Sequence, residues 1–286
     1  MTSDLRVFSI SVVKNEEDVI ACNLTEALKW SESIFVLDNG SKDATWEIVR
    51  SLAKNEPRIV AWKSWDVPFR DGLRAEVYNE FKGRAAPGDW WCMRLDADEF
   101  YLVDPRVVLA KVPTTHHVVC KDGIEYHLTF EDLHEYHFQG HFPEDMDHIR
   151  YYQPRTWAEV RFFRHRDRLT WDPDLPFPKH MGLTWRERVP MKHYQYRSRT
   201  QMEMRFSTRM KVMADLAAGP GLNHPEYKAW SHAIAGSIEE KLMYRSQLYC
   251  DSGQGIPRTD GVGNRYLNPW YSRMVKRFLH GIGVWP

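Results

Sequence analysis

The chain has 286 residues, of which 43% are hydrophobic and 27% are charged. This is ordinary globular composition, long enough for one large domain or for a domain with an appendage. Its 39 basic and 39 acidic side chains give zero net charge, which gives no indication of nucleic-acid binding.

The cysteines and the N-terminus indicate the compartment. Cys22, Cys92, Cys120 and Cys250 lie far apart and form no CxxC pair, so we expect all four to be reduced and buried in a cytoplasmic protein. The first residues contain no basic segment followed by a long apolar stretch, so we expect no signal peptide. No window approaches the roughly 20 apolar residues of a membrane span.

The first hundred residues alternate between strand-like and helix-like segments. Apolar runs bounded by polar or turn residues predict strands at 5–13, 33–41, 58–62 and 89–95. Helical spacing of apolar residues predicts the intervening helices, the last of them at 71–84. Strands separated by helices imply an α/β fold with a mostly parallel sheet covered on both faces, whose ligands bind at the carboxyl ends of the strands.

The remainder of the chain is less regular. Residues 116–128 read as a hairpin with Asp122-Gly123 at its turn, and residues 159–171 read as two more strands. Helices are predicted at 199–217 and 226–249. We therefore expect a main domain over residues 1–198 and a helical C-terminal extension, packed on that domain, over residues 199–286.

Polar clusters follow three of the predicted strands. A parallel sheet would gather them on one rim. The loop after the first strand, VVKNEED, has no glycines, which argues against both a dinucleotide-binding loop and a P-loop. A bound nucleotide would then be held by side chains and metal, and the candidates are Asn15, Glu16, Asp38, Asn39, Asp96 and Asp98.

The segment WWCMRLDADEF places three carboxylates directly after an apolar run. In a strand, residues i and i+2 face the same way, so Asp96 and Asp98 would converge on one ion. Carboxylate oxygens suit Mg²⁺ or Mn²⁺. Without a cation the two like charges would repel each other. Alternatively, both aspartates cap the following turn and Glu99 is solvated.

Four segments resemble known signatures. SISVVKNEEDVI, FVLDNGSKDAT and MRLDADEF, in this order within residues 5–105, resemble the signatures of family-2 glycosyltransferases with the GT-A fold. MKHYQYRSRTQMEMR, at 191–205, is similar to a later signature of one subgroup. The resemblance implies that residues 1–198 are a GT-A catalytic domain. It also implies that Mn²⁺ or Mg²⁺ bridges the diphosphate of a nucleotide sugar, for which we favour a UDP-sugar.

The resemblance also implies roles for individual residues. Asp38 would read the base of the nucleotide, Glu16 would lie near the ribose and base, and Arg74 would grip the diphosphate. His193 would be a third metal ligand beside Asp96 and Asp98. The alternatives are helix capping for the two carboxylates, a solvated helix face for Arg74 and a satisfied core position for His193.

An inverting transfer also needs a general base for the acceptor hydroxyl. The usual Glu-Asp of the family is absent from its usual setting. TWDPDLPFPKH, at 170–180, supplies Asp172 and Asp174, and of these we prefer Asp174. Glu131 and Asp132 are the other candidates.

These observations favour a metal-dependent glycosyltransferase that builds a surface polysaccharide or another glycan. A nucleotidyltransferase acting on sugar phosphates would also combine a metal, phosphates and an α/β sheet, but it usually has a glycine-rich first loop. A non-catalytic nucleotide- or sugar-binding module is the third alternative. Five histidines between residues 127 and 148 match no zinc signature and read as a loop or an acceptor groove.

Residues 267–282 have apolar side chains at helical spacing and basic residues on the other faces. Such a helix can lie at a membrane surface, which would suit a lipid-linked acceptor and a location at the inner membrane face. The alternative, which is the commoner arrangement of a terminal helix, is that the apolar stripe packs on the domain.

Overall fold

The structure is a computed structural model that describes residues 5–217, 237–259 and 268–286. The chain forms two compact units. Unit 1 comprises Met1–Ile124, Pro154–His193 and Ile256–Pro286, and unit 2 comprises Glu125–Gln153 and Tyr194–Gly255. The predicted nucleotide-binding, metal-binding and preferred catalytic residues, from Asn15 to His193, belong to unit 1. The division into a domain at 1–198 and an extension at 199–286 stays a prediction.

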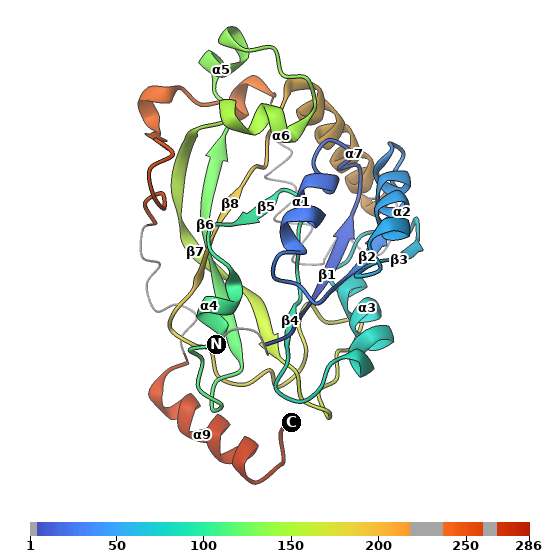
Figure 1. Cartoon of the computed structure of the whole chain (residues 1–286), viewed down its shortest axis with the longest axis vertical. Helices are drawn as coiled ribbons and strands as arrows, with labels where there is room; N and C mark the ends of the chain where they lie inside the picture. Colours follow the sequence, from blue (N-terminus) through green and yellow to red (C-terminus); the bar gives the residue numbers. More distant parts are fainter. Residues whose placement is uncertain (1–4, 218–236, 260–267) are drawn as a thin grey trace. The chain divides into compact units, whose positions relative to one another are not determined.

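The first part of the sheet is parallel. Its strands are β1 (Val7–Val13), β2 (Ser33–Asp38), β3 (Ile59–Ser64) and β4 (Trp90–Cys92), in the order β3-β2-β1-β4 (Figure 1). They are connected by helices α1 (Ile20–Ala27), α2 (Thr45–Asn55) and α3 (Leu73–Phe81). Because these strands are covered on both faces, β1 and β2 are buried along almost their whole length.

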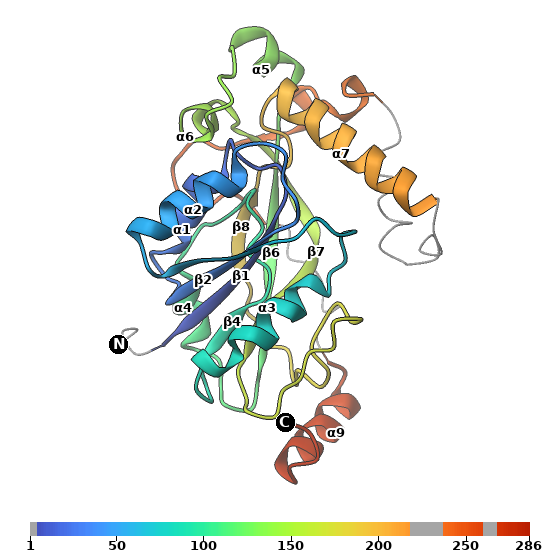
Figure 2. The same ribbon diagram turned by 90° about the vertical axis from the view of Figure 1, so that its right-hand side faces the viewer.

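Helix α3 packs on one face of these strands, on the opposite side from α1 and α2 (Figure 2). Alternate strand residues face α3, since successive side chains of a strand point to opposite faces. Phe8 and Phe35 pack against Trp91 with ring centroids 5.3 and 5.8 Å away, and Tyr78 of α3 meets Trp91 edge-on at 5.2 Å. This aromatic core fixes the position of α3, and therefore of the arginine in its first turn.

The second part of the sheet is formed by β5 (Glu99–Tyr101), β6 (Val118–His127), β7 (Tyr151–Arg164) and β8 (Val189–His193). The order continues β4-β7-β6-β8-β5, with β7 antiparallel to β4 and β5 antiparallel to β8. In unit 2, β9 (Tyr249–Cys250) pairs with the start of β7. The predicted α/β class is confirmed, with parallel pairing of β3, β2, β1 and β4 in this order.

Two predictions for the middle of the chain are wrong. Residues 118–127 form one strand rather than a hairpin, because β6 lies between β7 and β8 and pairing on both sides outweighs the turn preference of Asp122-Gly123. Residues 159–171 contain the end of β7 followed by a loop, rather than two strands.

The helix predicted at 199–217 is confirmed as α7 (Arg199–Ala217). Of the helix predicted at 226–249, residues 226–236 lie outside the described residues, and the remainder forms the short 3-10 helices Glu239–Lys241 and Arg245–Gln247 instead. The other described helices are α4 (Pro105–Leu109), α5 (Phe130–Glu135), α6 (Phe142–Asp145), α9 (Trp270–Gly281), and the 3-10 turns Lys82–Arg84 and Met146–His148.

All four cysteines are free. Cys92 and Cys120 are buried as expected, but Cys22 is only half-buried and Cys250 is exposed, so the expectation of four buried thiols is wrong. In the part of the chain that the structure describes, no helix is both long enough and apolar enough to cross a membrane.

Candidate active site

The loops after β1 and β2 are held together at one rim of the sheet. The N–H of Asn39 donates to the carbonyl of Val13 at 2.7 Å. Asn15 donates its N–H to the Ser41 hydroxyl at 3.0 Å, and its Oδ1 accepts from the N–H of Lys42 at 2.8 Å. Asn15 has a φ of 55°, a left-handed conformation that Asn tolerates better than most residues. The first two polar clusters therefore meet, as parallel strands predict.

Asp38, at the end of β2, is only 1% exposed. Its carboxylate accepts from the Ser64 hydroxyl at 2.7 Å and from the N–H groups of Gly40 and Ser41 at 3.2 Å. These bonds hold the loop that follows the strand. In the predicted contact with the base of a nucleotide, Asp38 would therefore use a carboxylate that these hydrogen bonds already hold in place.

The neighbouring side chains are held in the same way. Asn39 donates its amide N–H groups to the carbonyls of Trp65 at 2.9 Å and Val67 at 2.8 Å. Its buried Oδ1 accepts no hydrogen bond from the described residues. Glu16 is half-buried, and its backbone N–H donates to the Thr45 hydroxyl at 2.8 Å. The structure thus places Asn15, Glu16, Asp38 and Asn39 together.

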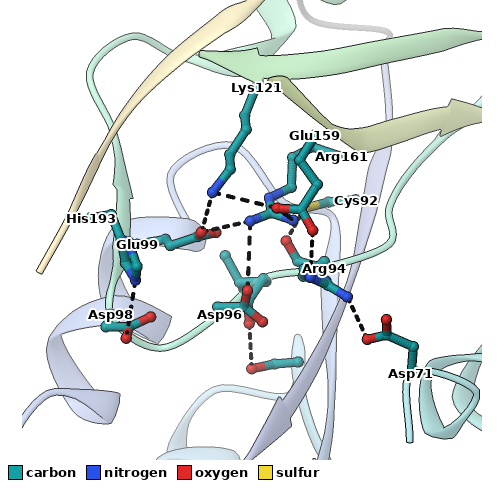
Figure 3. Close-up of polar contacts among 12 residues, drawn as sticks. Asp71, Cys92, Arg94, Asp96, Asp98, Glu99, Lys121, Glu159, Arg161 and His193 are labelled. Atoms are coloured by element: carbon teal, nitrogen blue, oxygen red, sulfur yellow. Dashed lines mark hydrogen bonds and ion pairs between the residues drawn. The ribbon is translucent and has the colours of Figure 1, made fainter. Parts of the chain in front are cut away.

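Asp96, Ala97 and Asp98 lie in a turn rather than in a strand. Strand β4 ends at Cys92, and the N–H of Glu99 donates to the Asp96 carbonyl at 3.2 Å. The buried amide of Asn23, on α1, donates to the carbonyls of Asp96 and Glu99 at 3.2 and 2.8 Å. The premise that Asp96 and Asp98 lie in a strand is wrong, and in this turn Asp98 points toward His193 whereas Asp96 lies beside Arg161 (Figure 3). Their convergence on one ion stays a prediction.

Asp96 is held by two guanidinium groups. Its Oδ1 lies 3.0 Å from Arg74 Nη2, and its Oδ2 lies 3.6 Å from Arg161 Nη2. Arg74 is only 3% exposed and also pairs with Asp71 at 2.5 Å, so its interpretation as a solvated helix residue is wrong. The structure brings Arg74 to the aspartate turn, and its contact with a diphosphate stays a prediction.

Asp98 and His193 form the second pair of the turn. Asp98 Oδ2 lies 3.4 Å from His193 Nε2, and the two side chains are 8% and 17% exposed. His193 is the last residue of β8 and lies opposite Glu99 of β5, which places it beside the turn. Its role as a metal ligand and the alternative of a satisfied core histidine both stay predictions.

The pair Asp98 and His193 fits a divalent ion. Two neighbouring ligands of an octahedral ion, each about 2.1 Å from it, lie about 3.0 Å apart. The observed separation of 3.4 Å is close to this value. Among the described residues, no group of three or more His, Cys, Asp or Glu side chains is placed to hold a metal. The metal-ligand set of Asp96, Asp98 and His193 stays a prediction, and of its members the structure brings Asp98 and His193 within 3.4 Å of each other.

A buried charge network lies behind the turn and was not predicted from the sequence (Figure 3). Arg161 is 1% exposed and pairs with Glu99 at 2.5 Å and with Glu159 at 3.0 Å. Lys121 also binds Glu99, at 2.7 Å, and Arg94 joins Glu159 to Asp71. Each carboxylate of the network has at least one cationic partner, so Glu99 is part of the interior and is not solvated.

The pKa of Glu159 reflects this network. Burial alone would raise the pKa, but the charges of Arg161, Arg94 and Lys121 outweigh burial and lower it to about 2. Glu159 therefore stays ionised at neutral pH. The signal that could have revealed the network is the pair of charges at alternate positions, 159 and 161, within the otherwise apolar segment 157–163 of β7.

The candidate bases lie in two different places. Asp172 and Asp174 are exposed, and Asp172 lies 3.7 Å from Lys179. Their loop packs against the start of α3, where a Cβ on Gly72 would lie 1.6 Å from the carbonyl oxygen of Pro173. This is the helix that carries Arg74 to Asp96.

The other two candidates have structural contacts in unit 2. Asp132 is buried, forms a capping box with Thr129 and pairs with Arg245 at 2.7 Å. Glu131 accepts from the backbone N–H of Arg245 at 3.3 Å. A carboxylate held in this way would have to give up its cap and its ion pair to act as a base. Of the four carboxylates, Asp172 and Asp174 thus remain the better candidates.

Comparison with known proteins defines the class. The model of the family described as "Glycosyl transferase family 2" matches residues 10–166, more than half of the chain. The chain belongs to glycosyl transferase family 2, and the predicted membership is confirmed. No curated protein matches the chain.

One solved structure that the chain resembles is the mannosyltransferase PcManGT from Pyrobaculum calidifontis in complex with GDP-Man and Mn2+. The two chains are 15% identical, with a TM-score of 0.40 over 82% of this chain and 76% of that chain. Because this structural similarity is low, the assignment to the family is based on the match to the family model and on the residues described above.

Proposed function

We propose that this chain transfers a sugar from a nucleotide-diphosphate sugar, with UDP as the favoured nucleotide, to a hydroxyl of a glycan or lipid-linked acceptor. The transfer inverts the anomeric centre and serves the synthesis of a polysaccharide. Family membership favours glycosyl transfer over nucleotidyl transfer. The observation that carries the proposal is the pairing of Asp98 with His193, at 3.4 Å, beside the turn residue Asp96 and its partner Arg74.

The side chains of the turn have separate roles in this proposal. Asp98 and His193 would hold Mn²⁺ or Mg²⁺, which neutralises the negative charge that develops on the departing nucleoside diphosphate. A mixed carboxylate and imidazole pair favours Mn²⁺, because Mg²⁺ prefers oxygen ligands. Arg74 orients the donor through its guanidinium group, and Asp96 keeps Arg74 in place.

The donor prediction is tested by incubating the protein with UDP-, GDP- and CDP-sugars and measuring the released nucleoside diphosphate. We expect release from one nucleotide class only, with Mn²⁺ at least as effective as Mg²⁺, and a loss of release of about a hundredfold in EDTA. Heat-treated protein is the control. Release that is unaffected by EDTA would contradict the metal-dependent reaction, and stabilisation of the protein by sugars alone would point to a binding module.

Asp174 is the proposed general base, with Asp172 as its neighbour. Asp174→Asn is expected to lower kcat roughly a hundredfold or more while leaving the KM for the donor nearly unchanged, because a base acts on the acceptor hydroxyl. Asp172→Asn is the matched control and should have a smaller effect. NMR of the product should show the anomeric configuration opposite to that of the donor. Retention, or an Asp174→Asn variant within threefold of the native kcat, would reject this assignment.

The proposal includes a cytoplasmic location at the inner face of the membrane, where a lipid-linked acceptor would be available. A membrane location requires a surface on the protein that binds lipid. The C-terminal helix of unit 1 offers such a surface, and it can be tested without knowing the donor or the acceptor.

A further inference from the structure

Helix α9 turns its apolar side toward solvent. Trp270, Met274 and Phe278, at intervals of four residues, are 72%, 65% and 64% exposed. Tyr271 and Val275 lie beside them and are 60% and 54% exposed. With 100° between successive residues, these side chains occupy one continuous side of the helix.

The opposite side of α9 faces the rest of unit 1 and makes polar contacts with it. Lys276 Nζ donates to the carbonyl of Gly182 at 3.0 Å, and Arg168 donates to the carbonyl of Gly283 at 2.7 Å. The half-buried residues of this side are Ser272, Lys276, Leu279 and His280. An amphipathic helix on a globular domain usually buries its apolar side. Here the arrangement is reversed, so the expectation that the terminal helix packs its apolar stripe on the domain is wrong.

The charged side chains at the C-terminal end of the chain are all basic. Residues 268–286 contain no Asp or Glu, and they carry Arg273, Lys276 and Arg277. Arg273 and Arg277 are exposed and lie, by helical spacing, between the apolar side and the side that contacts the domain. Exposed aromatic residues flanked by arginine are typical of a helix that lies in a membrane interface.

We propose that the exposed side of α9, formed by Trp270, Tyr271, Met274, Val275 and Phe278, is a docking surface for a bilayer that contains anionic phospholipids. A helix of 12 residues is about 18 Å long and cannot cross a hydrocarbon core of about 30 Å, so α9 lies in the plane of the interface.

Charge favours this occupant over a second copy of the chain. Two copies of α9 packed side to side would bring their arginines together, and like charges repel. An anionic bilayer accepts the apolar side chains and the arginines at the same time. This inference rests on the membrane location included in the proposed function and names the surface and the lipid. Vesicle binding is measured without donor or acceptor, so its failure is distinguishable from a failure of glycosyl transfer.

The test is flotation of the full-length protein with vesicles of phosphatidylcholine, with or without about one third phosphatidylglycerol. We expect the native protein to float with the anionic vesicles. The variant Trp270→Ser/Met274→Ser/Phe278→Ser should lose at least about tenfold in partitioning. The matched control is Val107→Ser/Met210→Ser/Ile256→Ser, which removes three apolar side chains that are also exposed, and it should float like the native protein. All three proteins should unfold at similar temperatures.

A second variant tests the contribution of the arginines to vesicle binding separately from that of the apolar side chains. Arg273→Glu/Arg277→Glu should abolish the preference for anionic over neutral vesicles. The proposal is overturned if the native protein does not float, or if the triple variant floats equally well. It is also overturned if sedimentation without lipid shows a native dimer that the triple variant cannot form, because the occupant would then be a second copy.

Discussion

Asp98→Asn is expected to lower kcat/KM at least about a hundredfold, while the protein stays folded. The substitution keeps the size of the side chain and removes its negative charge, so the partner of His193 can no longer hold a divalent cation firmly. Lewis-acid stabilisation of a departing diphosphate is worth several kcal/mol, and each 1.36 kcal/mol is tenfold in rate. The measurement is initial-rate kinetics with the donor identified by the screen, over a range of Mn²⁺ concentrations.

The expected signature is a shift of the Mn²⁺ dependence to higher concentration, which a general loss of fold would not produce. Asp66→Asn is the matched control, because Asp66 is an exposed carboxylate whose partners are Lys14 and Lys42. That variant should stay within about twofold of native activity, in keeping with the small worth of surface ion pairs. An Asp98→Asn enzyme with undiminished turnover would contradict a metal held by this pair.

The parallel part of the sheet was predictable because its signals are local. Apolar runs that end at Asn15 and Asp38 mark the ends of β1 and β2, and the parallel topology then brings these two positions together. The side-chain geometry of the aspartate turn was not predictable in this way. It depends on Asn23, which lies 73 residues before Asp96 and binds its carbonyl.

The rest of the site depends on contacts between distant strands. Glu99 meets Arg161 across 62 residues, and Asp98 meets His193 across β5 and β8. Helical or strand periodicity contains no information on such pairings. His193 was a candidate because its segment resembles a family signature, whereas Arg161 matched no signature, although its charge within the otherwise apolar segment 157–163 was visible.

Arg161→Met is expected to destabilise the protein by about 3 kcal/mol or more at neutral pH. The substitution removes the cation that pairs with Glu99 and Glu159 and leaves both carboxylates in the interior, and breaking one side of a buried ion pair typically costs about 3–5 kcal/mol. Lys121 still binds Glu99, which limits the loss. The measurement is the free energy of unfolding from urea titration. Arg161→Lys keeps the charge and should lose less, and Lys111→Met, which breaks the exposed pair with Glu187, should change stability by less than about 0.5 kcal/mol.

The pH dependence of the free energy of unfolding distinguishes two possible effects of Arg161→Met. One is the loss of the charge that compensates Glu159, and the other is the loss of side-chain packing. In the native protein the pKa of Glu159, about 2, lies below its usual value of 4.5, so its ionised form stabilises the fold above pH 4.5 and this contribution disappears as the pH falls toward 2. In Arg161→Met the pKa of Glu159 rises, because its strongest cationic partner is gone, and the variant has less of this contribution to lose. The difference in stability between the two proteins should therefore shrink mainly between pH 4.5 and pH 2. A difference that stays constant over this range would show that Arg161 acts through packing of its side chain and not through its charge.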